Sequence, residues 1–90
     1  MKFRIVVNVD RKKYRMWVER IYQSDQIEKY RVTGGQRSIV LQTNGPLMKK
    51  RHLKHRKGQW KLIEGQAWNM YALQEVIDTI QQYLDLNREL

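Results

Sequence analysis

Alternating apolar and polar residues open the chain and predict an antiparallel hairpin. From Phe3 to Val9, apolar side chains recur at every second position, a period typical of a half-buried strand. The next four residues, Asp10 to Lys13, are polar and are interpreted as the turn, because Asp is favoured at the first position of a turn. A second strand is predicted from Tyr14 to Tyr22.

The second predicted strand is apolar on both of its faces. Met16 and Val18 point to one face, whereas Trp17 and Ile21 point to the other. An open face that carries Trp and Ile side chains needs a cover. We therefore predict that Trp17 and Ile21 contact either a second copy of the chain, related by a two-fold axis, or a ligand that stacks on aromatic rings.

Three further segments have the character of strands. Residues 27–33 and 38–43 flank Gly34-Gly35, which tolerates the positive φ of a tight turn. Asn44-Gly45-Pro46 ends the second of these strands, because proline cannot donate a hydrogen bond to a ladder. Alternation returns at residues 60–64 and indicates a short fifth strand.

The last third of the chain changes to a helical period. Apolar residues recur at spacings of three and four between Met70 and Leu84, which predicts an amphipathic helix over about residues 69–86. Asn69 is its predicted N-cap. Strands followed by one helix define the α+β class. We expect one domain, with a meander-like antiparallel sheet of four to five strands over residues 2–64 and the helix packed on one of its faces.

Composition excludes several classes of protein. A chain of 90 residues without cysteine is too short for a two-domain enzyme and is neither a disulfide scaffold nor a cysteine-rich zinc module. Apolar runs such as Ile5-Val6-Val7 are short throughout the chain, so we predict no transmembrane segment. Arg4, Asn8 and Asp10 interrupt the first apolar segment, so we predict no signal peptide and a cytoplasmic location. No nucleotide-binding or hydrolase motif occurs, and we predict no cofactor.

Positive charge is concentrated in the middle of the chain. The net charge is +9, from 18 Lys and Arg against 9 Asp and Glu. Residues 29–63 contain ten basic side chains and no acidic one, whereas residues 64–90 contain five acidic side chains and Arg88 alone as a base. A block of this kind repels itself unless an anionic partner neutralises it.

Within this block, residues 47–58 lack a clear period and are predicted to form a basic loop. Cation clusters bind phosphate backbones by releasing counterions, and neighbouring rings stack on the bases of single strands. We therefore predict a non-enzymatic module that binds single-stranded nucleic acid. The predicted contacts are Arg37, Lys49, Lys50, Arg51, Lys54, Arg56, Lys57 and Lys61, with Trp60 as the stacking ring.

The basic loop and its neighbours also fit several alternative roles. The loop could serve solubility alone, or it could bind an acidic protein, including the helix of a second copy. The alternative function is a structural or interaction module that self-associates through the open sheet face at Trp17 and Ile21. His52 and His55 fit the acid and base of a small endoribonuclease. We predict no metal site there, because no Cys or nearby carboxylate completes a ligand set and the surrounding cations repel a metal ion.

The order of elements, several strands and then one helix, is similar to that of the small single-strand binders of the PUR and Whirly type. These families pair such units into dimers and bind nucleic acid on sheet faces. The resemblance covers most of the chain, concerns topology alone and assigns no residue. It implies a homodimer with nucleic acid as its partner.

Overall fold

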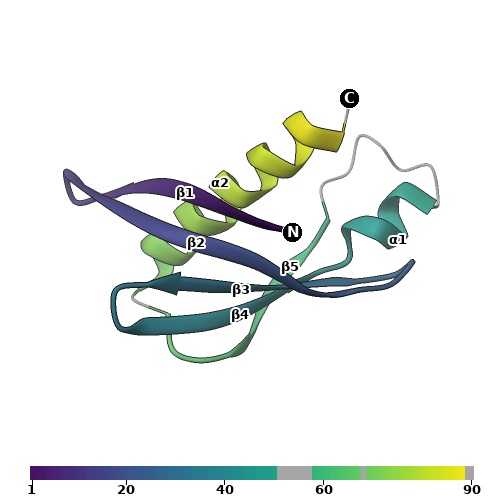
Figure 1. The fold of residues 1–90 in the computed structure, drawn as a ribbon, viewed down its shortest axis with the longest axis horizontal. Helices are drawn as coiled ribbons and strands as arrows, with labels where there is room; N and C mark the ends of the chain where they lie inside the picture. Colours follow the sequence, from purple (N-terminus) through teal and green to yellow (C-terminus); the bar gives the residue numbers. More distant parts are fainter. Residues whose placement is uncertain (51–57, 68, 89–90) are drawn as a thin grey trace.

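A computed structural model describes residues 1–50, 58–67 and 69–88 (Figure 1). It has the predicted α+β architecture, with five strands and a long C-terminal helix. A short additional helix lies between the fourth and fifth strands. The elements are β1 (Lys2–Val9), β2 (Lys12–Gln23), β3 (Glu28–Gly34), β4 (Arg37–Thr43), α1 (Gly45–Lys50), β5 (Trp60–Glu64) and α2 (Met70–Arg88).

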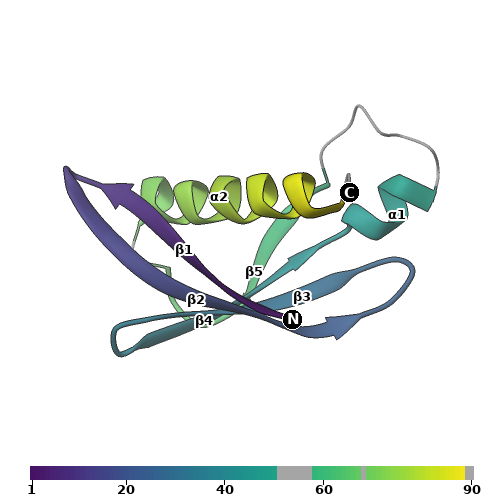
Figure 2. The same cartoon turned by 45° about the horizontal axis from the view of Figure 1, so that its top comes forward.

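The five strands form one antiparallel sheet in the order of the sequence, which confirms the predicted meander. The helix α2 packs against one face of this sheet (Figure 2). On the opposite face, the described part of the chain places no helix (Figures 1 and 2). Within the same ranges, neither helix combines the length and the apolar content that crossing a membrane requires.

The core lies between α2 and the sheet, and strand alternation decides which residues reach it. Phe3, Ile5 and Val7 are buried, while the residues between them are exposed. The ring of Phe3 stacks on that of Tyr83 from α2, with 3.8 Å between centroids. On β2, Met16 and Val18 are buried and Trp17 is exposed on the other face, as predicted. The buried residues of this core are Phe3, Ile5, Val7, Met16, Val18, Tyr30, Val32, Ile39, Leu41, Val76, Ile80 and Leu84.

The first hairpin turn is shorter than predicted. Val9 pairs directly with Lys12, so only Asp10 and Arg11 form the turn, with φ angles of 52° and 67°. Two-residue turns with positive φ at both positions match the twist of antiparallel strands, which favours them in hairpins. Asp10 therefore occupies a central position, where Asp tolerates the left-handed conformation, and not the first position of the turn. Lys12 and Lys13 belong to β2.

The second hairpin turn is shifted by one residue from the prediction. Gly34 pairs with Arg37 and ends β3, so the turn consists of Gly35 and Gln36. Of the two glycines, only Gly35 has a positive φ, of 61°. The ladder therefore extends as far as Gly34, and a single flexible residue is enough to close the turn.

The start of the predicted basic loop at residues 47–58 is helical, which corrects that prediction. α1 begins at Gly45, and the Met48 N–H donates to the Asn44 carbonyl oxygen at 3.2 Å. Pro46 lies in its first turn, where a helix has no use for the missing N–H. Proline thus ends β4 and also starts a helix. Residues 51–57 lie outside the described ranges.

The C-terminal helix and its predicted N-cap are confirmed. The Asn69 Oδ1 atom accepts a hydrogen bond from the Ala72 N–H at 2.8 Å. Met70, however, was predicted on the apolar stripe and is exposed. Ala72 takes its place at the start of a buried stripe that continues through Val76 and Ile80 at a spacing of four. Because each residue turns a helix by about 100°, Met70 lies on nearly the opposite side from Ala72.

Replacing Asn69 by alanine is expected to lower the free energy of unfolding by about 1 kcal/mol, because the first turn loses its side-chain acceptor. In thermal unfolding this corresponds to a decrease in Tm of about 4–8 °C for a domain of this size. Asn69→Asp keeps an acceptor at the same position and should retain the stability. An equal loss in both variants would contradict the capping role.

Candidate nucleic-acid interface

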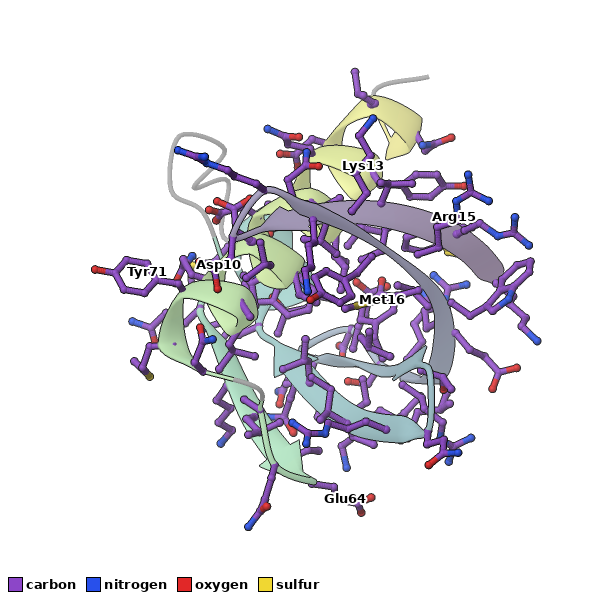
Figure 3. All side chains as sticks on the ribbon, turned by 90° about the vertical axis from the view of Figure 1, so that its left-hand side faces the viewer. Asp10, Lys13, Arg15, Met16, Glu64 and Tyr71 are labelled. Carbon is purple, nitrogen blue, oxygen red and sulfur yellow. The ribbon has the colours of Figure 1, made fainter. Side chains whose placement is uncertain are left out.

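The sheet face turned away from α2 is a basic surface, which we call the open sheet face. Its side chains alternate with the core residues along each strand, so that Arg15 points outward and Met16 points inward (Figure 3). Counted over the five strands alone, it carries seven cations and two carboxylates, a net charge of +5. The charged and aromatic residues of this face are Lys2, Arg4, Lys13, Arg15, Trp17, Glu19, Tyr22, Lys29, Arg31, Lys61 and Glu64.

Trp17 lies on this face beside two cations from the edge strand β1. Arg4 is its direct cross-strand partner, and the Arg4 guanidinium carbon lies 4.5 Å from the ring centroid. The Lys2 ammonium lies 5.1 Å from the same ring. These are cation–π distances, and Trp17 as a whole is still 43% exposed. The arrangement places an accessible ring next to groups that bind phosphate.

Tyr22 forms a second aromatic position of the same kind. In the register it faces Lys29, whose ammonium lies 5.3 Å from the ring centroid. Gln42 and Lys61 continue this row across β4 and β5. A β-bulge between Arg20 and Tyr22 causes the exposure, because without it Tyr22 would share the inner face with Met16. Ile21 lies in the bulge and is exposed as well.

A row of mixed charge separates the two aromatic positions. Glu19 faces Lys2 on β1 and Arg31 on β3, and the Arg31 Nη1 atom lies 3.6 Å from the Glu19 Oε1 atom. Both side chains of this ion pair are about half exposed, so the pair contributes little to stability. Glu64 ends the same row on β5, opposite Val40. The cations on either side of this row therefore dominate the potential of the face.

The structure places Trp60 on the other side of the sheet from Lys61. Trp60 faces the buried Thr43 in the register and is half-buried towards α2. Its ring centroid lies 5.8 Å from that of Tyr30, and its Nε1–H donates to the Gln81 Oε1 atom at 2.9 Å. These contacts occupy the ring and its polar edge. Trp60 and Lys61 were predicted to contact nucleic acid together, but they lie on opposite faces of the sheet.

Few of the other predicted contact residues reach the open sheet face. Arg37 is exposed at the start of β4, beside the second hairpin turn. Lys49 and Lys50 end α1. Lys61 is the one member of the predicted set that the described ranges place on the open sheet face. The predicted residues outside the described ranges are Arg51, His52, Lys54, His55, Arg56 and Lys57.

Six of the seven cations on this face were missed by reasoning from the sequence. Each lies at an alternate position of β1, β2 or β3, a pattern that also fits an ordinary solvated strand face. Alternation alone could have placed Lys2 and Arg4 on one face of the first strand. Their position beside Trp17 depends on the register between strands, which the sequence does not specify locally.

Comparison with known proteins gives no match, whether to a protein-family model, a curated protein or a solved structure. The similarity to the PUR and Whirly type therefore stays a prediction from element order, and it assigns no role to any residue. The function has to be inferred from the chemistry of the open sheet face.

Proposed function

We propose that the protein is a non-enzymatic module that binds single-stranded nucleic acid on the open sheet face. The observation that carries the proposal is the pair of exposed rings, Trp17 and Tyr22, each with a cation within 4.5–5.3 Å of its centroid. Cations follow a phosphate backbone, while each stacked base contributes about 1–3 kcal/mol. We also propose that the protein is cytoplasmic, as predicted from its sequence.

The alternative is self-association through the same face, and the exposed apolar side chains of Val6, Trp17 and Ile21 favour it. The charge of the face opposes it. Two-fold pairing would bring one surface of net charge +5 against an identical surface, and like charges across an interface are unfavourable. A polyanion neutralises the face instead. We therefore place nucleic acid on the open sheet face and assign any homodimer to another surface.

The proposal is tested by fluorescence anisotropy with a labelled single strand, a duplex of the same sequence and heparin, each at two salt concentrations. We expect the single strand to bind most tightly. If about five phosphates are engaged, log K should fall with log salt at a slope of about −3.5. Affinity that does not change with salt would contradict the proposal, and preference for heparin over both nucleic acids would identify a general polyanion binder.

Replacing Trp17 by alanine is expected to weaken single-strand binding by roughly 5- to 150-fold, the equivalent of one lost base stack. Heparin has no bases, so its affinity should change little. Tyr14→Ala is a matched control, because Tyr14 is 44% exposed on the same strand but pairs with Val7 on the opposite face. The control should bind like the unmodified protein. Equal losses in both variants would show that the effect is not specific to the open sheet face.

A further inference from the structure

Glu19 is a carboxylate placed between the two rings of a surface that is otherwise mostly cationic. It follows Trp17 by two residues on the same face of β2, about 7 Å along the strand, and precedes the bulge that exposes Tyr22. In the part of the chain that the structure describes, Glu19 makes one ion pair, with Arg31. Because Arg31 lies on β3, this ion pair does not involve Lys2 and Arg4, the two β1 cations beside Trp17, which stay available to phosphates.

A carboxylate at this position opposes one mode of nucleic-acid binding and favours another. A strand that lays its phosphates along the centre of the face would bring them against the negative charge of Glu19. A strand that turns its bases towards the sheet avoids this repulsion, because its phosphates lie further out near the surrounding cations. Bases turned inwards are also the arrangement that stacking on Trp17 and Tyr22 requires.

The ionised carboxylate can only accept hydrogen bonds, which limits the base edges that suit it. Cytosine, adenine and guanine carry an exocyclic amino group, a donor, whereas thymine and uracil carry only carbonyl oxygens as exocyclic polar groups. The Arg31 contact at 3.6 Å is longer than a hydrogen bond, so both oxygens of Glu19 keep their capacity to accept. A base stacked on the exposed part of Trp17 would lie beside Glu19, which is two residues further along the same face of β2.

We infer that Glu19 is a specificity determinant of the open sheet face, which accepts a hydrogen bond from the exocyclic amino group of a stacked base. The inference rests on the proposed function and deepens it. The preferred ligand is a single strand whose bases carry an exocyclic amino group (cytosine, adenine or guanine), over one made of thymine or uracil.

The test compares two labelled oligonucleotides of equal length, oligo(dC) and oligo(dT), at neutral pH. Both are pyrimidine strands, and their bases offer opposite groups at the 4-position. We expect the unmodified protein to bind oligo(dC) roughly 10- to 150-fold more tightly, the effect of one hydrogen bond to a charged group. In Glu19→Gln the ratio should fall to about 1, because a carboxamide both donates and accepts. Glu19 is half exposed, so the substitution preserves the fold.

A matched control is Glu64→Gln, which removes the other carboxylate of the face, on the edge strand β5 away from Trp17. Its dC-to-dT ratio should equal that of the unmodified protein. A ratio that stays the same in Glu19→Gln while both affinities rise would overturn the inference, since Glu19 would then act by repulsion alone. A ratio of 1 in the unmodified protein would also overturn it. If neither oligonucleotide binds the unmodified protein, the proposed function itself fails.

Discussion

Replacing Glu28 by alanine is expected to lower the free energy of unfolding by about 3 kcal/mol, because the buried Tyr30 hydroxyl loses this acceptor and the partly buried Arg20 loses its counter-charge. Glu28 is 1% exposed. Its Oε1 atom accepts from the Tyr30 hydroxyl at 3.1 Å, and its Oε2 atom accepts from the Arg20 Nη1 atom at 3.3 Å. The substitution removes the acceptor of both donors, one of which lies in the core. Domains of this size have only about 5–15 kcal/mol of stability, so the loss is a large part of the total.

The measurement is urea unfolding followed by circular dichroism, with two controls from the same sheet. Glu28→Gln keeps the shape and an acceptor oxygen, so its loss should be smaller than that of Glu28→Ala. Glu19→Ala breaks the exposed pair with Arg31 and should change the stability by less than about 1 kcal/mol. Equal destabilisation by Glu28→Ala and Glu19→Ala would show that the burial of Glu28 does not increase its contribution to the free energy of unfolding.

The buried Glu28 shows what local patterns leave out. Glu28 shares its strand face with Tyr30 and Val32, so alternation alone places it on the side of the core. A carboxylate at such a position is usually exposed at the end of a strand, because a buried charge needs a partner. That partner, Arg20, comes from the neighbouring strand and is positioned next to the bulge of β2. Sequence alone does not reveal such a pairing across strands.

Elements with a strong period could be predicted from the sequence, and their ends could not. Alternation sets the faces of β1 and β2, and the spacing of three and four sets α2, because each pattern is repeated over many residues. The two hairpin turns and the start of α1 each depend on one or two residues. Asp10, Gly35 and Pro46 fit more than one local geometry, and the paired ladders decide which geometry occurs.

The candidate site was predictable in part for the same reason. The exposure of Trp17 follows from alternation along its own strand. Its neighbour Arg4 depends on the register between β1 and β2, and the exposure of Tyr22 depends on a bulge without a local signal. Trp60 stands next to Lys61 in the sequence, yet successive strand residues point to opposite faces. An aromatic residue beside a basic run is therefore weak evidence for a stacking site within a strand.

Gly65 is the position where a single added methyl group should destabilise the fold most. Its φ of 86° lies in the region that favours glycine. A Cβ atom there would lie 2.7 Å from the Ser38 carbonyl oxygen and 3.1 Å from the Ile39 Cα atom. Both are backbone atoms of β4, which cannot move without disturbing the ladder. We expect Gly65→Ala to cost about 3 kcal/mol, from the strained φ together with the steric overlap.

Gly35→Ala separates these two causes. Gly35 also has a positive φ, of 61°, but no atom lies within 4 Å of the position its Cβ would occupy. Its substitution should therefore cost only the conformational penalty, about 1–2 kcal/mol. Thermal unfolding should show a decrease in Tm of about 4–8 °C per kcal/mol for both variants. If the two decreases in Tm are equal, the positive φ alone explains why glycine is needed at position 65. The close contact between Gly65 and the backbone of β4 would then contribute nothing to the loss of stability.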